Sequence, residues 1–391
     1  MNKRIAVIMV LLMTLFLGFG IIIPVMPIAI PNAENNPLHL GLLLSVYSLF
    51  SFIFSPLWGG LSDRIGRRPV IMTGLIGFAL SFFLFGIAGD NLVLMYLSRI
   101  LGGLASGAAT ACAVAYVADI TTEENRTKGM GLVGMSIGMG FIFGPAIGGL
   151  LSGFGTAVPF FAAGVLSLLT LLFAGIYLQE SLTPEQRRGT GEPRVSRWSA
   201  FSGKLKYLYV LSFFVSFTLA GLESTLQVFA MRRFDITPQG IGYLFLISGI
   251  VGALIQGGVV RRVKPGTENR YVLFGLLASA VGFFLLMLAD SMLTTAIYLS
   301  VFSVGNALIR PCVTSLITQK TTVRQGVASG LSSSMDSLGR ITGPLLGTLL
   351  FNVQDSLPYL IGGVLCIAAI ILLQRFIVLD RKAVTLKTAV S

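Results

Sequence analysis

Five ionisable side chains lie inside long, mostly apolar segments of the sequence: Arg99, Glu223, Arg310, Asp336 and Arg340. A charged side chain inside a membrane span costs roughly 2.5–3.5 kcal/mol on the insertion scale, and such residues usually serve a function. A carboxyl group held away from water favours its neutral form, so it can take up and release a proton. These residue types predict proton or ion chemistry within a membrane.

Glu223 is the first candidate for proton exchange, because no Lys or Arg lies within a helical turn of it along the chain. When ionised, it could also attract a cationic substrate. Alternatively, this acid lies near the external mouth of its span and is simply wetted by solvent. Arg310 could be the counter-ion of Glu223, or it could snorkel or pair with backbone carbonyls.

Asp336 and Arg340 are spaced i, i+4, so they share a helix face and can form a structural pair. Asp336 could instead carry a proton. Arg99 keeps its proton near neutral pH, because a guanidinium is not deprotonated in proteins. We therefore assign Arg99 electrostatic control of a neighbouring carboxyl or bound water, with a purely structural role as the alternative.

The composition indicates the elements that must position these residues. Of the 391 residues, 54% are hydrophobic and only 11% charged, whereas an ordinary soluble domain carries about 25% charged residues. This excludes a soluble enzyme, a nucleic-acid-binding domain and a secreted disulfide scaffold. We expect an all-α polytopic membrane protein with twelve transmembrane helices. They are predicted at 5–27, 39–58, 69–88, 92–117, 129–151, 158–178, 207–230, 239–260, 271–289, 293–317, 327–350 and 358–378.

Basic residues gather on one side of this topology. The net charge is +12, yet among the Lys and Arg of the loops and tails only Arg232 and Arg233 fall on the external side. This is the positive-inside asymmetry, so we expect both termini in the cytoplasm. The charge reflects topology and contact with anionic membrane lipid rather than nucleic acid.

The sequence lacks the residues that several classes of activity require. His39 is the only histidine, the three cysteines fit no metal or disulfide pattern, and no G-x4-G-K-[ST] phosphate loop occurs. We therefore expect no enzyme activity, no metal and no cofactor, and an energy source other than ATP.

A polar, basic linker at 179–206 divides the chain into two six-helix halves, 1–178 and 207–391. The halves share a repeat: Gly131, Gly140, Gly144, Pro145 and Gly148 recur at a constant offset as Gly330, Gly339, Gly343, Pro344 and Gly347. Duplicated halves that enclose a midplane site are typical of secondary transporters.

The segment after the second span reads GGLSDRIGRR, from Gly59 to Arg68. Glycine permits a tight connection, and Asp63 can pair with an arginine and so latch one conformation. A basic cytoplasmic turn without a further role is the alternative.

At every position the segment resembles the signature loop of the major facilitator superfamily, G-x-L-[AS]-D-R-x-G-R-[KR]. The resemblance implies the fold of that superfamily, with two pseudo-symmetric halves. It marks a conformational motif made of Gly59, Asp63, Arg64, Gly66, Arg67 and Asp119, the last at the end of the fourth span.

Small residues at near-helical spacing mark the fifth span and allow close approach of another helix, while Pro145 permits a kink. The pattern G-x8-G-x3-GP-x2-GG resembles the antiporter motif of exporters in the superfamily and implies outward, proton-driven antiport. It is carried by Gly131, Gly140, Gly144, Pro145, Gly148 and Gly149.

The first span also carries a family pattern. Leu17, Gly18, Pro24 and Pro27 resemble the first-helix pattern of the twelve-span drug:proton antiporters. Nearly the whole chain is similar to Gram-positive multidrug efflux pumps of the quinolone-resistance type. Those relatives usually carry an acid where this chain has Ala307, so a second cavity acid is missing unless Asp336 replaces it.

The resemblance implies a proton-coupled antiporter that exports amphiphilic or cationic drugs from the cytoplasm by alternating access. It implies a monomer in the cell membrane of a bacterium, with a role in antibiotic resistance. The expected proton-coupling residues are Glu223, Asp336, Arg310 and Arg99, and the expected substrate-binding residues are Phe16, Glu223, Gln227, Phe229, Asn306 and Arg310. The alternative is a dedicated exporter or lipid flippase with a single physiological substrate, because Asp336 and Arg340 suit a polar or anionic head group. A non-transporting sensor on the same fold is a third hypothesis.

Overall fold

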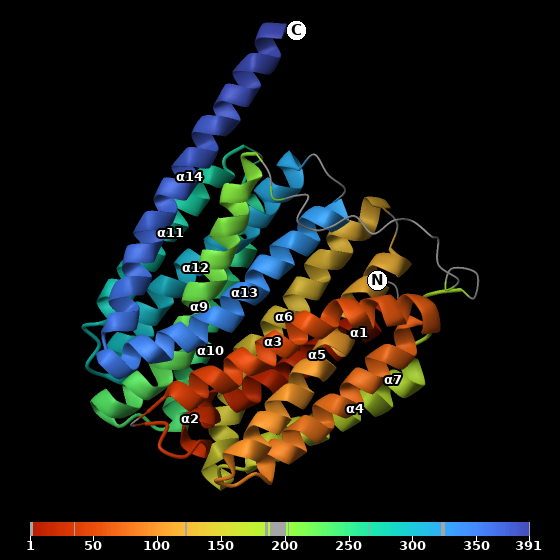
Figure 1. The fold of residues 1–391 in the computed structure, drawn as a ribbon, viewed down its shortest axis with the longest axis vertical. Coiled ribbons are helices and arrows are strands. Elements are labelled where there is room, and N and C mark those ends of the chain that lie inside the picture. Colours follow the sequence, from red (N-terminus) through yellow and green to blue (C-terminus); the bar gives the residue numbers. More distant parts are fainter. Residues whose placement is uncertain are drawn as a thin grey trace. The chain divides into compact units, whose positions relative to one another are not determined.

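A computed structural model describes residues 3–34, 36–121, 123–183, 187, 201, 203–264, 266–321 and 325–390. These residues are almost entirely helical, and no β-strand occurs among them. They form two compact units (Figure 1). Most of the linker predicted at 179–206 lies outside the described residues.

Unit 1 holds the helices drawn from red to yellow in Figure 1, together with residues 235–246. Its elements are α1 (Lys3–Ile22), η1 (Ile23–Val25), α2 (Met26–Ala29), α3 (Leu38–Ile65), α4 (Arg67–Gly86), α5 (Leu92–Ile120), α6 (Glu123–Leu151), η2 (Ser152–Phe154) and α7 (Val158–Tyr177).

Unit 2 holds the helices drawn from green to blue. Its elements are α9 (Leu205–Phe234), η4 (Val260–Arg262), α11 (Glu268–Leu286), α12 (Met292–Lys320), α13 (Gln325–Val353) and α14 (Leu357–Val390). The remaining helix, α10 (Pro238–Gly258), belongs to unit 1 up to Leu246 and to unit 2 from Ile247.

Twelve long helices in the described part of the chain confirm the predicted number. Eleven of them, among the described residues, contain an 18-residue window apolar enough to cross a membrane. The exception is α13, which is rich in serine and glycine and carries Asp336 and Arg340. Its position in the chain, rather than its hydropathy, identifies it as a span.

Three helix pairs pack in the same way in both units, which supports the predicted pseudo-symmetry, whereas the packing of α3 on α5 in unit 1 has no comparable counterpart between the described residues of α10 and α12. In unit 1, α1 packs on α6, α4 on α5, and α4 on α7. In unit 2, α9 packs on α13, α11 on α12, and α11 on α14. Each pair in one unit occupies the same place in the helix order as its counterpart in the other.

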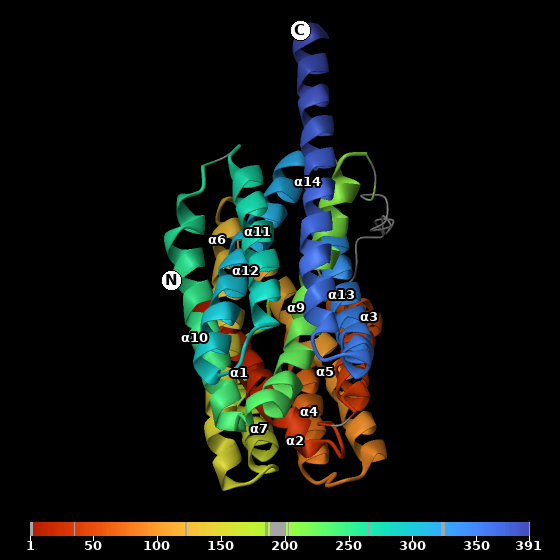
Figure 2. The ribbon, with the colours of Figure 1, turned by 90° about the vertical axis from the view of Figure 1, so that its left-hand side faces the viewer.

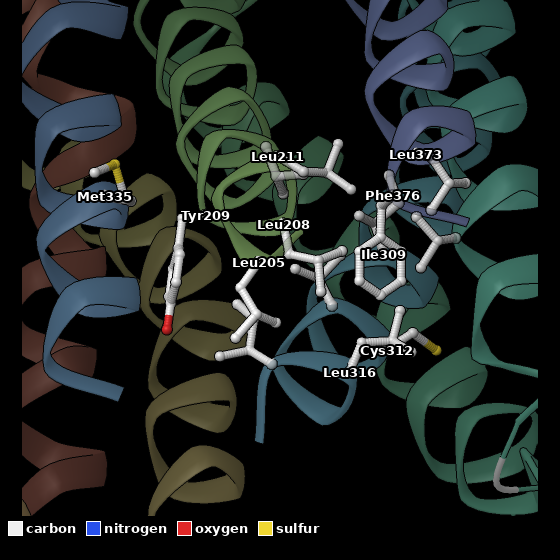
Figure 3. Packing of buried hydrophobic residues seen from close by; sticks show 14 of the residues in the cluster. Leu205, Leu208, Tyr209, Leu211, Ile309, Cys312, Leu316, Met335, Leu373 and Phe376 are labelled. Carbon is white, nitrogen blue, oxygen red and sulfur yellow. The ribbon is translucent and has the colours of Figure 1, made fainter. Parts of the chain in front are cut away.

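The core of unit 2 is a cluster of buried side chains from α9, α11, α12, α13 and α14 (Figure 3). Lipid tails are as apolar as leucine, so close van der Waals packing rather than escape from water holds such helices together. The cluster includes Leu208, Tyr209, Leu211, Ile309, Cys312, Leu316, Met335, Leu373 and Phe376.

Each unit ties the start of its first long helix to the segment at or after its last one. In unit 1, the guanidinium of Arg4 donates to Oε1 of Gln179 at 2.8 Å. In unit 2, Nζ of Lys204 lies 2.5 Å from Asp380, which also pairs with Lys320 at 3.1 Å. Beyond Asp380, α14 continues past the ends of α9 and α11 (Figure 2).

The connection between the second and third spans is shorter than its sequence suggests. The turn was expected over Gly59 to Arg68, but α3 remains helical through Ile65 and α4 begins at Arg67. Gly66 alone breaks the helix, with a φ of 109°. The turn prediction was therefore wrong for Gly59, where a side chain would meet open space.

Candidate functional site

Glu223 lies on α9 two residues after Gly221, where this helix packs against α13. A Cβ atom at Gly221 would lie 3.2 Å from the carbonyl oxygen of Gly343, and one at Gly347 would lie 3.2 Å from Cα of Gly221. Small residues on both helices allow this approach. Glu223 itself is partly buried, whereas its neighbours Leu222 and Ser224 are buried.

Asp336 of α13 is held from two sides. Its Oδ2 lies 3.3 Å from a terminal nitrogen of Arg310 on α12, and its Oδ1 accepts a hydrogen bond from the Ser216 hydroxyl on α9 at 2.9 Å. The i, i+4 spacing suggested Arg340 as a partner, yet the structure pairs this carboxylate with an arginine from another helix. The polar contacts of Asp336 therefore join three helices of unit 2.

The charges of unit 2 form a connected set around these helices. Arg340 and Arg310 both lie near enough to act electrostatically on the Glu223 carboxyl. Arg310 thus has Asp336 as its direct partner and Glu223 as a more distant one. The four groups carry two positive and two negative charges when both acids are ionised.

Polar side chains on α12 and α13 reach the surface of the protein inside the expected membrane region. The Arg310 side chain is 48% exposed, and Thr314, Ser329 and Ser333 are exposed as well. Lipid is a poor environment for a charged side chain, and polar residues in spans therefore face the protein interior or a water-filled cavity. This polar face is consistent with the wall of an aqueous pathway.

The other candidate substrate residues of unit 2 are less accessible. Gln227 is 3% exposed, and its amide nitrogen donates to the backbone oxygen of Glu223 at 3.1 Å. Its Oε1 has no hydrogen-bond partner among the residues that the structure describes. Phe229 is 1% exposed and its ring packs edge-on against Tyr359. Asn306 is partly buried and lines a small, mostly apolar cavity with Thr218.

Two candidates lie in unit 1. Phe16 on α1 is partly buried, with its ring centroid 5.3 Å from that of Phe141. Arg99 on α5 is 1% exposed and stacks over Phe85 at 4.7 Å, a cation–π contact. Its guanidinium also donates to the Ser98 hydroxyl at 3.3 Å. The described partners of this buried arginine are thus two aromatic rings, Phe85 and Phe82, and a neutral hydroxyl.

The conformational motif is built around Arg67, which is 8% exposed. Its guanidinium contacts Asp63 at 2.7 Å and Asp119 at 2.9 Å, and it donates to the Ser62 hydroxyl at 2.6 Å. Asp119 comes from the end of α5, so the contact ties the start of α4 to another helix. Arg64, by contrast, is exposed.

Glu180, which the sequence reasoning missed, completes this cluster. Its two carboxylate oxygens accept the backbone N–H groups of Arg67 at 2.8 Å and Arg68 at 3.1 Å. An anion at a helix N-terminus satisfies unpaired donors and the helix dipole. The neighbouring Ser181 hydroxyl donates to Asp119 at 2.9 Å. The only sequence signal was an acid directly after the sixth span.

The antiporter motif forms a helix seam in unit 1. A Cβ atom at Gly140 would lie 2.7 Å from the nitrogen of Leu17, and one at Gly144 would lie 2.7 Å from Cα of Gly20. Gly148 likewise packs directly on Ile21. Pro145 is accommodated without a break in α6, since neighbouring groups can satisfy a freed carbonyl in a membrane helix.

Gly149, the last residue of the motif, has a different partner in unit 1. A Cβ atom there would lie 2.7 Å from the carbonyl oxygen of Pro238 and 3.3 Å from Cα of Gly242, both in the part of α10 that belongs to this unit. The surroundings of Gly131 lie outside the described side chains. The motif therefore packs α6 on two neighbours.

Among the described residues, no group of three His, Cys, Asp or Glu side chains comes together as a metal site. The ionisable groups of the site are instead held by hydrogen bonds and ion pairs between helices.

The chain is similar to known membrane proteins over nearly its full length. The family model described as Major Facilitator Superfamily matches residues 8–331 and 270–390. The chain is 32% identical to Multidrug resistance protein 2 of Bacillus subtilis over 91% of this chain and 90% of that protein. It is 30% identical to Quinolone resistance protein NorA of Staphylococcus aureus, over 95% and 96% of the two chains.

A solved structure shows the same architecture. The crystal structure of the human organic anion transporter MFSD10 (TETRAN) superposes with a TM-score of 0.73 at 25% identity, over 95% of this chain and 99% of that one. Family match, relatives and fold agree with one another. This chain therefore belongs to the Major Facilitator Superfamily and is a multi-pass membrane transporter, not an enzyme.

Proposed function

We propose that this transporter is a proton-coupled antiporter that exports amphiphilic or cationic drugs by alternating access. The observation that carries the proposal is the partly buried Glu223 carboxyl, in a membrane helix, within electrostatic reach of Arg340 and Arg310. The names of the two bacterial relatives, a multidrug and a quinolone resistance protein, support drug export as the class of transport.

In this proposal, Glu223 exchanges a proton for substrate. When the site faces the cytoplasm, the ionised carboxylate binds the cationic group of a drug. When the site faces outward, a proton neutralises the carboxylate and the drug is released. Arg340 and Arg310 favour the ionised form between these steps, because a nearby positive charge stabilises a carboxylate. We further propose that Arg99 positions water or a carboxyl rather than carrying the proton.

Proton entry supplies enough free energy for this exchange. Each proton brings roughly 1.4 kcal/mol per pH unit and about 2.3 kcal/mol per 100 mV of membrane potential. One proton moving down a gradient of one pH unit and 100 mV therefore contributes about 3.7 kcal/mol, enough for several-hundred-fold accumulation of a drug without net charge. Export of a monovalent cation against the potential takes back about 2.3 kcal/mol, which leaves about 1.4 kcal/mol, or roughly tenfold accumulation.

The cluster around Arg67 supplies the conformational latch in this proposal. Arg67 must leave Asp119 if α4 and α5 separate at this end, and such an ion pair is strong because it is largely buried. We place the cluster and both termini on the cytoplasmic side. We further propose that the protein works as a monomer in the cell membrane of a bacterium.

Acid-driven uptake of ethidium into inside-out vesicles tests the proposal. Wild-type vesicles are expected to accumulate the dye, and a protonophore should abolish this uptake. Glu223→Gln removes the proton carrier and should reduce gradient-driven uptake at least tenfold at matched expression. Asp90→Asn, at an exposed acid in the loop between α4 and α5, is the matched control and should transport normally.

The outcomes separate the hypotheses. Gradient-dependent uptake that persists in Glu223→Gln would reject Glu223 as the carrier and make Asp336 the next acid to test. Absence of any gradient-dependent uptake by the wild type would reject multidrug export. A dedicated exporter or lipid flippase would then be the better explanation.

A further inference from the structure

Two buried hydroxyl groups of unit 2 lack a partner. The hydroxyl of Tyr359 on α14 and that of Ser279 on α11 form no hydrogen bond with any residue that the structure describes. Tyr359 is 0% exposed and Ser279 is 2% exposed. A buried hydroxyl without a partner costs free energy, so proteins nearly always supply a neighbouring group or an ordered water. These two side chains therefore indicate a ligand that forms hydrogen bonds.

Each of these hydroxyls lines a small cavity beside α9. Ser279 lines the first cavity, of about 10 Å³, together with Thr218 of α9 and Asn306 of α12. Tyr359 lines the second cavity, of about 20 Å³, together with Thr218 and Thr225 of α9. One water molecule needs a free volume of about 10–15 Å³, so the first cavity just reaches this limit and the second exceeds it. Both cavities are too small for a drug-sized molecule.

The threonines of α9 can accept hydrogen bonds from a molecule in these cavities. Thr225 donates its hydroxyl proton to the carbonyl oxygen of Gly221 at 2.9 Å. Thr218 likewise donates to the carbonyl oxygen of Phe214 at 2.8 Å. Each threonine oxygen keeps a lone pair for a further donor. Tyr359 and Thr225 line the same cavity without meeting hydrogen-bond geometry, and a water molecule can bridge such a separation.

Ser279 occupies a place that an aromatic ring fills in unit 1. A Cβ atom at Gly275 would collide with α12, and one at Gly74 would collide with α5, so these two glycines correspond. Four residues after them lie Ser279 in unit 2 and Phe78 in unit 1. Phe78 is 1% exposed, and its ring packs edge-on against Phe82 at 5.1 Å. A serine in this place leaves the space of the ring open, which accounts for the first cavity.

Tyr359 also has an aromatic counterpart without a hydroxyl. Gly363 and Gly164 correspond, because a Cβ atom at either would collide with a phenylalanine ring, of α11 and α4 respectively. Four residues before them lie Tyr359 in unit 2 and Phe160 in unit 1. Phe160 is 1% exposed and stacks on Phe85 with ring centroids 4.4 Å apart. Unit 2 thus carries a buried hydroxyl at a position where packing requires only a ring.

We propose that these two cavities of unit 2 are binding sites for water. One water molecule joins the Tyr359 hydroxyl to Thr225 and Thr218. A second joins the Ser279 hydroxyl to Asn306 and Thr218. Thr218 lines both cavities and so connects the two waters. An apolar occupant such as a lipid tail would leave both hydroxyls unpaired, whereas water satisfies them. This inference is independent of the proposed drug export.

Radiolytic footprinting of the wild-type protein in detergent tests the inference directly. Brief X-ray exposure converts bound water into hydroxyl radicals, which oxidise the side chains that touch this water, and mass spectrometry locates the products. We expect oxidation of Tyr359 and of Cys366, which lines the first cavity. Tyr116 and Cys312 are the matched controls, because they are also buried but line neither cavity. The two cavity residues should react several-fold faster than their controls.

The variant Tyr359→Phe distinguishes a hydrated hydroxyl from a dry one. If water binds there, the variant loses a hydrogen bond and should melt at a lower temperature than the wild type. If the hydroxyl is unpaired, its removal relieves a desolvation penalty and the melting temperature should stay the same or rise. Tyr243→Phe, at a side chain of α10 that is 42% exposed, is the control and should melt as the wild type does.

Thr218→Val tests the connection between the two waters. Tyr359→Phe and Ser279→Ala should each lower the melting temperature less in this background than in the wild type, because the shared acceptor is already absent. Strictly additive changes would overturn the role of Thr218. Oxidation of Tyr359 and Cys366 no faster than that of their controls, or a melting temperature of Tyr359→Phe at or above that of the wild type, would overturn the water sites themselves.

Discussion

The carboxylate of Glu180 occupies the space that a side chain at Gly66 would need. An added Cβ at this glycine would collide with Oε2 of Glu180, which at the same time accepts the N–H of Arg68 at 3.1 Å. Gly66 also has a φ of 109°, which other residues rarely adopt. The glycine and the acid therefore define one contact point between the second and third spans and the segment after the sixth.

Gly66→Ala should destabilise the protein by about 1–3 kcal/mol, the usual cost of a strained backbone position. Thermal unfolding in detergent, followed by tryptophan fluorescence, measures the effect. Gly59→Ala is the matched control, because this glycine is helical and an added Cβ meets open space. Equal melting temperatures for the two variants would contradict the assignment.

Glu180→Ala should cost about 0.5–2 kcal/mol, as expected for loss of a side chain that caps a helix N-terminus. Arg187, which lies 3.8 Å from the carboxylate, also loses a partner. In the Glu180→Ala background, Gly66→Ala should cost less than in the wild type, because the collision is gone. Strict additivity of the two changes in melting temperature would show that the two residues act independently.

Gly343→Ala should disturb the contact between α9 and α13. A Cβ atom there would meet the carbonyl oxygen of Phe217 and lie 3.1 Å from the nitrogen of Gly221. Overpacking of this kind typically costs about 1–3 kcal/mol, and the seam carries Glu223, so we expect lower stability together with slower ethidium transport. Gly252→Ala, in an open position on α10, serves as the control. Unchanged melting and transport in Gly343→Ala would mean that the seam can relax.

The sequence motifs predicted contacts best where the residues lie in one segment, because their spacing along the helix then decides which side chains meet. Asp63 and Arg67 are four residues apart, with only Gly66 separating the end of α3 from the start of α4. In the structure, Arg67 contacts both Asp63 and Asp119. The repeated glycines of the fifth and eleventh spans line helix seams in both units, because close approach of backbones requires small residues at this period.

Partners from other helices were harder to predict. The i, i+4 rule suggested Arg340 for Asp336, whereas the contact of Arg310 with this carboxylate at 3.3 Å was not predicted. The spacing of residues along one helix carries no information on how a second helix is turned. The role of Glu180 was not predicted for a similar reason: its partners are backbone N–H groups, which every helix start supplies whatever its sequence.

The polar composition of α13 bears on how the chain enters the membrane during synthesis. The other long helices are apolar enough to partition into lipid one at a time, but α13 is not, because serines, Asp336 and Arg340 lower its hydropathy. Its insertion must draw on partners that are already in place, and the packing of α13 against α9 and the pairing of Asp336 with Arg310 of α12 supply them. Both helices precede α13 in the chain, so ribosomal order delivers the partners before the helix that needs them.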